Sequence, residues 1–88
     1  MIKVNEIIWK ETFVEKIENK HHVTMFEVEE ILYGRNKVYR IAKGDVLALG
    51  KTSAGRYLSV FFILKKNRRV LPISARDMDN KERREYVK

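Results

Sequence analysis

The segment Ile73-Ser74-Ala75-Arg76-Asp77-Met78 connects an expected strand to an expected helix, and the charged run Lys81-Glu82-Arg83-Arg84-Glu85-Tyr86 follows it. Alternation along a strand places Ser74 and Arg76 on one face, with Ile73 and Ala75 on the other. The end of a strand that gives way to a helix often presents functional side chains on a rigid support. The guanidinium of Arg76 is planar and permanently charged, which suits it to binding phosphate.

The 88 residues are enough for one hydrophobic core, and we expect a single domain spanning residues 1–88. The first helix should run from about Lys10 to His21, because one helical face recurs there every four residues, at Trp9, Phe13, Ile17 and His21. His21 is therefore either a histidine at the edge of the core or a proton carrier at a helix end. His22 points roughly 100° away from this face.

A second helix should begin at Thr24, since Glu27 three residues later completes a capping box. Val23 before the cap and Val28 after it form a hydrophobic staple across the same helix start. Gly34 should end this helix in the left-handed conformation that glycine adopts readily. Only a short turn then separates the two helices.

After the second helix the hydrophobic period changes to that of strands. We expect four strands, over Val38–Ile41, Asp45–Gly50, Arg56–Leu64 and Val70–Ala75. A turn at Lys43-Gly44 and hairpin loops over residues 51–55 and 65–69 separate them. The third strand is apolar on both faces, which is typical of a central strand. Pro72 lacks a backbone N–H, so the last strand should be bulged or have an open edge there.

The ends of the chain complete the expected architecture. Residues Val4–Trp9 should form a short strand or a packed lead-in, and a third helix should run from Asp77 or Asp79 to the C-terminus. The predicted fold class is α+β, with two N-terminal helices, an antiparallel sheet of about four strands and a C-terminal helix.

Charge is divided unevenly along the chain. Residues 1–33 contain four Lys and seven Glu, a net charge of −3, whereas residues 34–88 contain fifteen Lys and Arg against five acidic residues, a net charge of +10. A polyanion such as RNA or DNA, or an acidic protein, would be attracted to the second half. The alternative is a solvated basic surface that keeps the protein soluble.

The sequence lacks the signatures of several functional classes. The sequence has no cysteine, which excludes disulfides, thiolate zinc sites and cysteine nucleophiles. It has no apolar run of about 18 residues and no signal-peptide pattern at Met1–Glu6, which fits a cytoplasmic protein without membrane contact. It has no glycine-rich phosphate loop, no GxSxG motif and no close pair of Asp on an expected strand. We therefore expect no metal ion or other cofactor.

What remains is a basic and aromatic set: Lys51, Arg56, Tyr57, Arg76, Arg83 and Tyr86, with His21 and His22. Such a set could cleave RNA without a metal, because RNA carries its own nucleophile, the 2′-OH. Arginine and lysine would stabilise charge on the phosphate, and a tyrosine or histidine would move the proton. The alternative is structural: Arg76 pairs with Glu82 or Asp79 and caps the last helix, while Tyr86 packs on the sheet.

Three tracts carry a family resemblance. The first is Trp9 followed by Lys20-His21-His22-Val23-Thr24, and the second is Leu49-Gly50-Lys51-Thr52 followed by Gly55-Arg56-Tyr57-Leu58 and Val60-Phe61-Phe62. The third and most specific is Ile73-Ser74-Ala75-Arg76-Asp77-Met78 with Glu82-Arg83-Arg84 and Tyr86. Together, from Trp9 to Tyr86, these tracts resemble the BrnT family, the toxins of type II toxin–antitoxin systems.

The resemblance implies a RelE-like fold and an endoribonuclease that cleaves RNA and inhibits translation. It also implies neutralisation by a cognate small antitoxin, whose DNA-binding domain would bring the complex to operator DNA. Among the residues in the matching motifs, the resemblance implies a role for His21, Arg56, Arg76, Glu82, Arg83 and Tyr86. We predict that the catalytic residues are Arg76, Arg56, His21 and Tyr86, and that the RNA-binding residues are Lys51, Arg83, Lys20 and His22. The alternative function is a toxin-like binding module that lacks catalysis and acts as a partner-bound repressor subunit.

Two residues depart from the pattern of the family. His22 stands where a glycine is usual after Lys-His, so either the turn is made without glycine's freedom or the helix runs one residue further. Pro72 stands where an ordinary strand-forming residue is usual.

Overall fold

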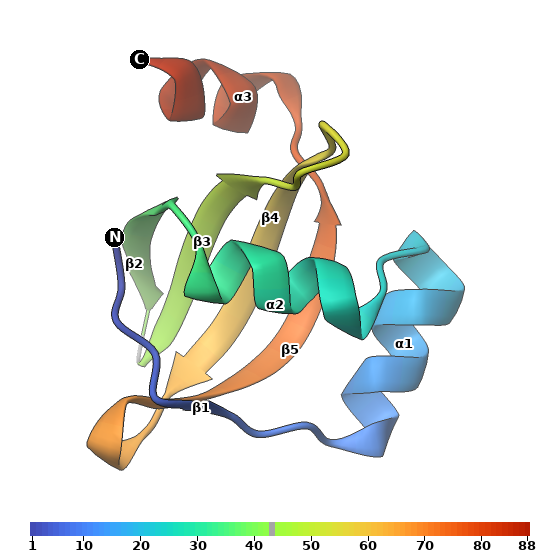
Figure 1. The fold of residues 1–88 in the computed structure, drawn as a ribbon, viewed down its shortest axis with the longest axis vertical. Coiled ribbons are helices and arrows are strands. Elements are labelled where there is room, and N and C mark those ends of the chain that lie inside the picture. Colours follow the sequence, from blue (N-terminus) through green and yellow to red (C-terminus); the bar gives the residue numbers. More distant parts are fainter. Residues whose placement is uncertain (43) are drawn as a thin grey trace.

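The computed structural model describes residues 1–42 and 44–88 and shows an α+β fold (Figure 1). In chain order its elements are β1 (Glu6–Ile7), α1 (Glu11–His21), α2 (Met25–Tyr33), β2 (Asn36–Ala42), β3 (Asp45–Lys51), β4 (Tyr57–Leu64), a 3-10 turn (Lys66–Arg68), β5 (Arg69–Asp77) and α3 (Asn80–Val87). The strands form a sheet in the order β1-β5-β4-β3-β2.

The predicted fold class is confirmed, but the described sheet has five strands rather than about four. The additional strand is β1, which pairs in parallel with β5 through Glu6 with Arg69 and Ile7 with Val70. All other neighbouring strands pair antiparallel, so the sheet is mixed. A strand of two residues is too short to show alternation, which is why the sequence pattern did not separate a strand from a packed lead-in.

Helices α1 and α2 lie on one face of the sheet, and their apolar sides meet its strands there (Figure 1). The resulting core consists of Ile17, Val23, Val28, Ile31, Leu32, Val46, Ala48, Leu58, Val60, Phe62, Val70 and Ala75. Helix α3 lies at one end of the sheet, next to the loop between β3 and β4 (Figure 1). In the described part of the chain, the opposite face of the sheet is covered by a helix only at that end.

Helix α2 begins as predicted. The Thr24 hydroxyl accepts a hydrogen bond from the Glu27 N–H at 3.1 Å, and the Glu27 carboxylate accepts one from the Thr24 N–H at 3.0 Å. The prediction for its end was wrong in one respect: Gly34 follows the helix with φ −96° and ψ −157°, an extended conformation. Glycine is needed there because a Cβ on Gly34 would lie 2.5 Å from the carbonyl oxygen of Glu30.

Helix α1 ends at His21, and His22 makes the turn in the left-handed region, with φ 54° and ψ 40°. The His22 N–H donates to the Glu18 carbonyl at 3.0 Å, and the Val23 N–H donates to the Ile17 carbonyl at 3.4 Å. The absence of glycine therefore does not lengthen the helix. A left-handed conformation costs a non-glycine residue about 1 kcal/mol, so His22 is held there by the surrounding contacts.

Strand β5 contains the bulge predicted at Pro72. Phe61 pairs with Ser74 and Phe62 pairs with Pro72, so Ile73 is the extra residue. After the bulge Ser74 and Arg76 share one face of the sheet, as alternation predicted. Ala75 is fully buried on the other face.

Helix α3 begins after Asp79, within the predicted range. The Asp79 carboxylate accepts the Glu82 N–H at 2.8 Å and the Glu82 carboxylate accepts the Asp79 N–H at 3.0 Å, a second capping box. The predicted turn at Lys43-Gly44 falls partly outside the described residues, since Lys43 is not among them. In the ranges 1–42 and 44–88 no helix is long and apolar enough to span a membrane.

Candidate functional site

The predicted site residues fall into two clusters on opposite faces of the sheet. Arg76 and Asp77 are consecutive in β5, so their side chains leave the strand on opposite sides. Arg76 binds Glu82 of α3, whereas Asp77 binds Arg56 beside the turn between α1 and α2. The two arginines predicted to bind one phosphate therefore do not face a shared cleft.

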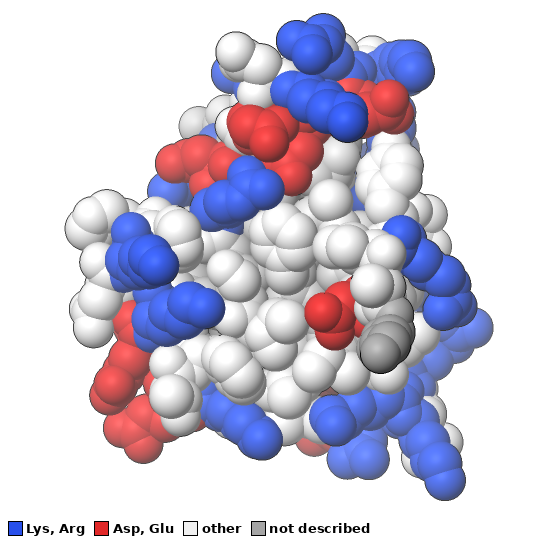
Figure 2. Space-filling model, turned by 180° about the vertical axis from the view of Figure 1, so that it is seen from behind, with Lys and Arg blue, Asp and Glu red and all other residues white. Residues whose placement is uncertain are grey.

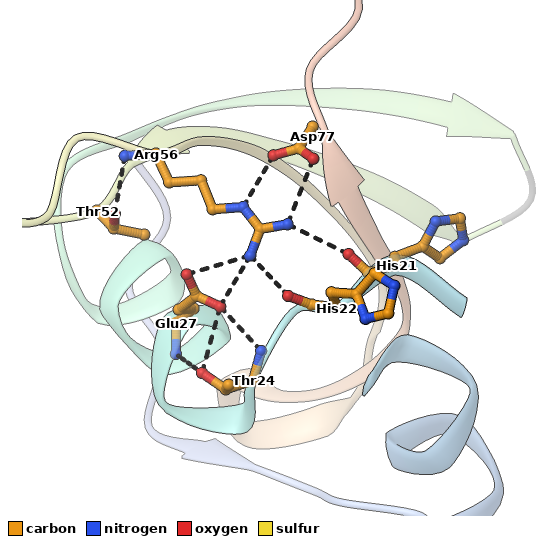
Figure 3. Close-up of polar contacts among 7 residues, drawn as sticks. All are labelled: His21, His22, Thr24, Glu27, Thr52, Arg56 and Asp77. Carbon is orange, nitrogen blue, oxygen red and sulfur yellow. Dashed lines mark hydrogen bonds and ion pairs between the residues drawn. The ribbon is translucent and has the colours of Figure 1, made fainter. Parts of the chain in front are cut away.

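Arg56 precedes β4 and joins the α1–α2 turn to the end of β5 (Figure 3). Its Nε donates to Asp77 Oδ1 at 2.8 Å, and its Nη1 donates to the His22 carbonyl at 2.7 Å and to Glu27 Oε1 at 3.1 Å. Its Nη2 donates to the His21 carbonyl at 3.2 Å and to Asp77 Oδ2 at 3.3 Å. All three guanidinium nitrogens are thus engaged within the protein.

We call Arg56, Glu27 and Asp77, with the backbone of His21 and His22, the Arg56 cluster. Its electrostatics favour the charged forms of Arg56 and Asp77. Hydrogen bonding to Asp77 raises the pKa of Arg56, against the opposing effect of burial. The same hydrogen bond holds the pKa of Asp77 below its ordinary value, and the nearby charge of His21 adds a smaller effect in the same direction. Because two carboxylates, Glu27 and Asp77, already bind one guanidinium, a phosphate would have to displace one of them to reach Arg56.

The histidines contact Arg56 through their backbone rather than through their rings. Both imidazoles are directed away from the guanidinium (Figure 3). His21 is half-buried, whereas His22 and Lys20 are exposed at the end of α1. Lys20, His21 and His22 are consecutive at the end of α1, beside Arg56 and its partners.

Arg76 pairs with Glu82, as the structural alternative anticipated. Nη1 donates to Glu82 Oε1 at 2.7 Å and Nη2 donates to Oε2 at 2.9 Å, a two-pronged ion pair. Nη1 also donates to the Asp77 carbonyl at 3.2 Å. The Nε–H of Arg76 has no hydrogen-bond partner in the part of the chain that the structure describes. Arg76 therefore keeps a donor for a ligand, whereas Arg56 does not.

Glu82 is held as an anion at the base of α3. Burial disfavours its charge, but hydrogen bonds from Arg76, the Asp79 N–H and the Ser59 hydroxyl outweigh this effect, and the pKa of Glu82 lies below its ordinary value. The Ser59 hydroxyl donates to Glu82 Oε1 at 2.9 Å, and Ser59 is fully buried. Glu82 thus fixes the orientation of Arg76 and is poorly suited to act as a general acid at neutral pH.

Cations and aromatic rings gather beside this ion pair, and we call Lys37, Lys51, Tyr57, Arg83 and Tyr86 the Tyr57 cluster. Arg83 Cζ lies 4.1 Å and Lys51 Nζ lies 5.2 Å from the centre of the Tyr57 ring. The rings of Tyr57 and Tyr86 meet edge to face, with 6.0 Å between their centres. Lys37 Nζ lies 6.0 Å from the centre of the Tyr86 ring. Three predicted residues, Lys51, Arg83 and Tyr86, are thereby brought together.

Three residues in or beside the Tyr57 cluster were not among the predicted site residues: Lys37, Ser59 and Phe61. Phe61 carries the Arg76 guanidinium 5.2 Å above its ring. Strand alternation could have identified Ser59 and Phe61, since they follow Tyr57 at intervals of two. Lys37 reaches α3 only through the tertiary fold, where its ammonium donates to the carbonyls of Glu85 and Lys88, each at 3.2 Å.

The chemistry available at the α3 end of the sheet is that of cations and phenols. Among the residues described, no three His, Asp or Glu side chains come close enough together to hold a metal ion. The arginines and lysines can bind phosphate groups, and Tyr57 and Tyr86 can exchange protons. Reactions that need only charge stabilisation and proton transfer are therefore within reach of these side chains.

The arrangement of these elements is the fold of a BrnT-type toxin, as the sequence resemblance predicted. One solved structure that it matches is the BrnT ribonuclease toxin of Brucella abortus, with a TM-score of 0.72 and 22% sequence identity. The match covers 85% of this chain and 97% of that one. No protein-family model matches the sequence, and no curated protein matches it either.

Proposed function

We propose that this protein is the ribonuclease toxin of a toxin–antitoxin system and that it cleaves RNA without a metal ion. One observation carries the proposal: in a fold shared with a ribonuclease toxin, Arg76 keeps an unused Nε–H and the Tyr57 cluster lies beside it. By contrast, the Arg56 guanidinium is fully engaged, so we assign it a positioning role.

In this proposal Arg76 binds the phosphate that is cleaved, and Glu82 holds its guanidinium in place. Lys51 and Arg83 bind neighbouring phosphates and stabilise the charge that develops in the transition state. The 2′-OH of the RNA attacks the adjacent phosphorus and displaces the 5′-oxygen of the next nucleotide. Tyr86 is the proton carrier on the same face of the sheet.

His21 is the alternative proton carrier, on the side of the sheet where Arg56 lies. If RNA passes around the sheet edge to reach it, Lys20 and His22 are the phosphate contacts there, because both are exposed at the end of α1. Tyr86 and His21 belong to different clusters, so separate substitutions distinguish these two routes.

The biological setting follows from the same proposal. Cleavage of RNA in the cytoplasm would inhibit translation and arrest growth. A cognate small antitoxin would neutralise the toxin, and its DNA-binding domain would carry the complex to operator DNA.

The test is cleavage of a structured RNA by the purified protein in excess EDTA. We expect cleavage by the wild type and a loss of roughly 100-fold or more in the Arg76→Ala variant, since it removes the main charge on the phosphate. Arg84→Ala is the matched control, because Arg84 is an exposed arginine of α3. Intact RNA with the wild type, together with normal growth on expression, would contradict the proposal.

A second candidate function is a non-catalytic module that acts as a partner-bound repressor subunit. It is favoured by the ion pairs of both predicted phosphate-binding arginines, Arg56 with Asp77 and Glu27 and Arg76 with Glu82. This function predicts a tight complex with the product of a neighbouring reading frame and no RNA cleavage. The same EDTA assay, carried out beside a binding assay with that product, separates the two functions.

A further inference from the structure

A group of exposed cations lies at the turn between β4 and β5. Four of the five residues 65–69 are Lys or Arg, and all five are exposed. The exposed side chains of Lys3 and Arg40 reach the same place, since they line one hollow together with Arg68. We call the six cations the hairpin-end patch: Lys3, Arg40, Lys65, Lys66, Arg68 and Arg69. Figure 2 shows Lys and Arg gathered at the lower right, where this turn lies in the view from behind.

Three of these cations border one hollow of about 370 Å³. Its lining includes Lys3, Arg40 and Arg68 and the aliphatic side chains of Val38, Val46 and Leu64. Among the described residues that line it there is no carboxylate and no aromatic ring, so the lining neither repels a phosphate nor stacks a nucleobase. Cations from three separate segments around an aliphatic floor therefore suit the sugar–phosphate backbone of a nucleic acid.

The turn holds Arg68 in a conformation that costs free energy. Asn67 has φ 61° and Arg68 has φ 54°, so two successive residues lie in the left-handed region. Turns of this kind ordinarily use Asn and Gly, because other side chains are strained there. Asn5 fixes the turn, since its N–H donates to the Arg68 carbonyl and its side-chain amide donates to the Asn67 carbonyl, both at 2.9 Å. A fixed turn that keeps arginine where glycine would be unstrained points to a use for that side chain.

The patch has a surplus of positive charge. None of its six cations makes an ion pair within the ranges 1–42 and 44–88. Two carboxylates lie nearby: Glu6 is the register partner of Arg69, and Asp45 is the register partner of Ile63. Six cations against two carboxylates leave a net charge of +4 among these described side chains. The patch therefore attracts a polyanion even with both carboxylates ionised.

The patch lies at the end of the sheet opposite α3 (Figure 1). Along β4, Ser59 is paired with Arg76, and Leu64, next to the turn, is paired with Val70. The five steps from Ser59 to Leu64 correspond to roughly 17 Å, at about 3.4 Å per residue. A stacked nucleic-acid strand advances about 3.4 Å per nucleotide, so roughly five nucleotides span this distance. A longer strand bound at Arg76 can thus reach the patch.

The composition of the patch distinguishes a nucleic acid from a protein partner. Protein interfaces centre on buried apolar and aromatic side chains, and lysine is depleted in them. Residues 65–69 contain no apolar side chain. A second copy of the chain that docked through the same patch would place like charges together and would be repelled. A phosphate backbone, by contrast, needs only cations.

We infer that the hairpin-end patch is a second binding surface for the phosphate backbone of RNA, separate from the Arg76 site. The inference rests on the proposed function, which supplies RNA as the substrate at Arg76. Contacts at the patch hold a long RNA without reading its base sequence, and they contribute affinity rather than chemistry.

The binding test uses a fluorescent 12-nucleotide oligouridylate whose 2′-O-methyl groups remove the nucleophile, titrated with the full chain at several salt concentrations. Each lost phosphate contact lowers the slope of log K against log salt by about 0.7 for a single strand. We expect Lys66→Gln/Arg68→Gln to lower the slope by about 1.4 and to weaken binding roughly tenfold at low salt. Lys10→Gln/Lys16→Gln is the matched control, because it removes the same charge from exposed positions of the α1 segment. It should keep the slope of the wild type.

The variant Arg68→Gly separates the charge of the side chain from the fold of the turn. Glycine adopts φ 54° without strain, so we expect Tm to rise by a few degrees. The salt slope should nevertheless fall by about 0.7, since one cation is lost. If the double variant fails to fold, Arg68→Gly still decides the matter.

Cleavage kinetics provide a second readout. For a long RNA, Lys66→Gln/Arg68→Gln should raise KM several-fold and leave kcat unchanged, because the patch binds substrate and transition state equally. A uridine trimer is too short to extend from Arg76 to the patch, so its cleavage should not change.

Two results would overturn the inference. The first is a wild-type salt slope in both Lys66→Gln/Arg68→Gln and Arg68→Gly. The second is displacement of the oligouridylate by a 12-residue polyglutamate that binds more tightly at the same salt concentration, which would assign the patch to an acidic protein. If the wild type binds RNA through the patch but cleaves none, only the proposed function fails.

Discussion

Arg76 and Asp77 are neighbours in β5, yet each makes an ion pair on a different face of the sheet. Arg76 binds Glu82 of α3 at 2.7 Å, and Asp77 binds Arg56 at 2.8 Å. One peptide unit of β5 thus connects the anchor of the C-terminal helix with the anchor of the α1–α2 turn. Substitutions in each cluster test which of the two stabilises the fold and which takes part in RNA cleavage.

Replacement of Arg56 should chiefly lower the free energy of unfolding and should have a smaller effect on RNA cleavage. Arg56→Ala leaves Glu27, Asp77 and two carbonyls without their common donor, and we expect a loss of about 2 kcal/mol in the free energy of unfolding. Urea denaturation measures it, with Arg84→Ala as the control. Unchanged stability combined with abolished RNA cleavage would instead make Arg56 a ligand-binding residue.

Replacement of His22 by glycine should stabilise the protein. His22 holds φ 54°, a conformation that glycine adopts without strain, so we expect a gain of about 0.5–1 kcal/mol. Asn67→Gly is the matched comparison at φ 61°, and should gain less because asparagine tolerates this region better than most residues. A loss of stability in His22→Gly would mean that the imidazole makes a contribution larger than its backbone strain.

Stability should fall in acid because of Glu82 and Asp77. Both pKa values are lower in the folded protein than in the unfolded chain, so the unfolded chain binds more protons in acid. Their contribution is complete above the ordinary carboxyl pKa of about 4 and is lost as pH falls through the lowered folded values. Thermal unfolding between neutral and acidic pH measures the slope.

The Glu82→Gln variant tests the origin of this acid sensitivity. It should be less stable at neutral pH and should show a shallower dependence on pH, while Glu15→Gln on the exposed side of α1 should keep the slope of the wild type. An unaltered slope in Glu82→Gln would assign the effect to Asp77 alone.

Removal of the Lys37 ammonium should loosen α3. Lys37 donates to the Glu85 and Lys88 carbonyls at the C-terminal end of the helix, where a positive charge is favourable. Lys37→Met keeps most of the side-chain length, and we expect a cost of about 1 kcal/mol together with faster amide hydrogen exchange in α3. Lys81→Met, an exposed position of the same helix, should leave exchange unchanged. Unaffected exchange in Lys37→Met would show that the Arg76–Glu82 pair alone anchors α3.

Local features of the sequence predicted local structure well. Thr24 with Glu27 set the start of α2, and Pro72 marked a bulge, because both effects act within a few residues. Gly34 was misassigned because a glycine required by close approach looks the same in sequence as one required by a positive φ. The strand β1 was left open because two residues show no period.

The sequence indicated which types of residue belong to the candidate site, but not which of them lie together in the fold. Lys51, Arg83 and Tyr86 do come together around Tyr57. Arg56 and His21 lie apart from them, because alternation tells which residues share a face but not which face the helices cover. Lys37 was not predicted because its hydrogen-bond partner, the Glu85 carbonyl, lies 48 residues away in the sequence.

The pairing of β1 with β5 sets an order of assembly. The Asn5 N–H donates to the Arg68 carbonyl at 2.9 Å, and the Asn5 side chain donates to the Asn67 carbonyl at 2.9 Å, across 62 residues of sequence. Closing so long a loop costs conformational entropy that is offset only once the hairpin of β4 and β5 exists. We therefore expect β1 to be added late in folding and to detach early. While it is absent, the edge of β5 is open to other chains, and the missing N–H of Pro72 guards that edge against strand addition.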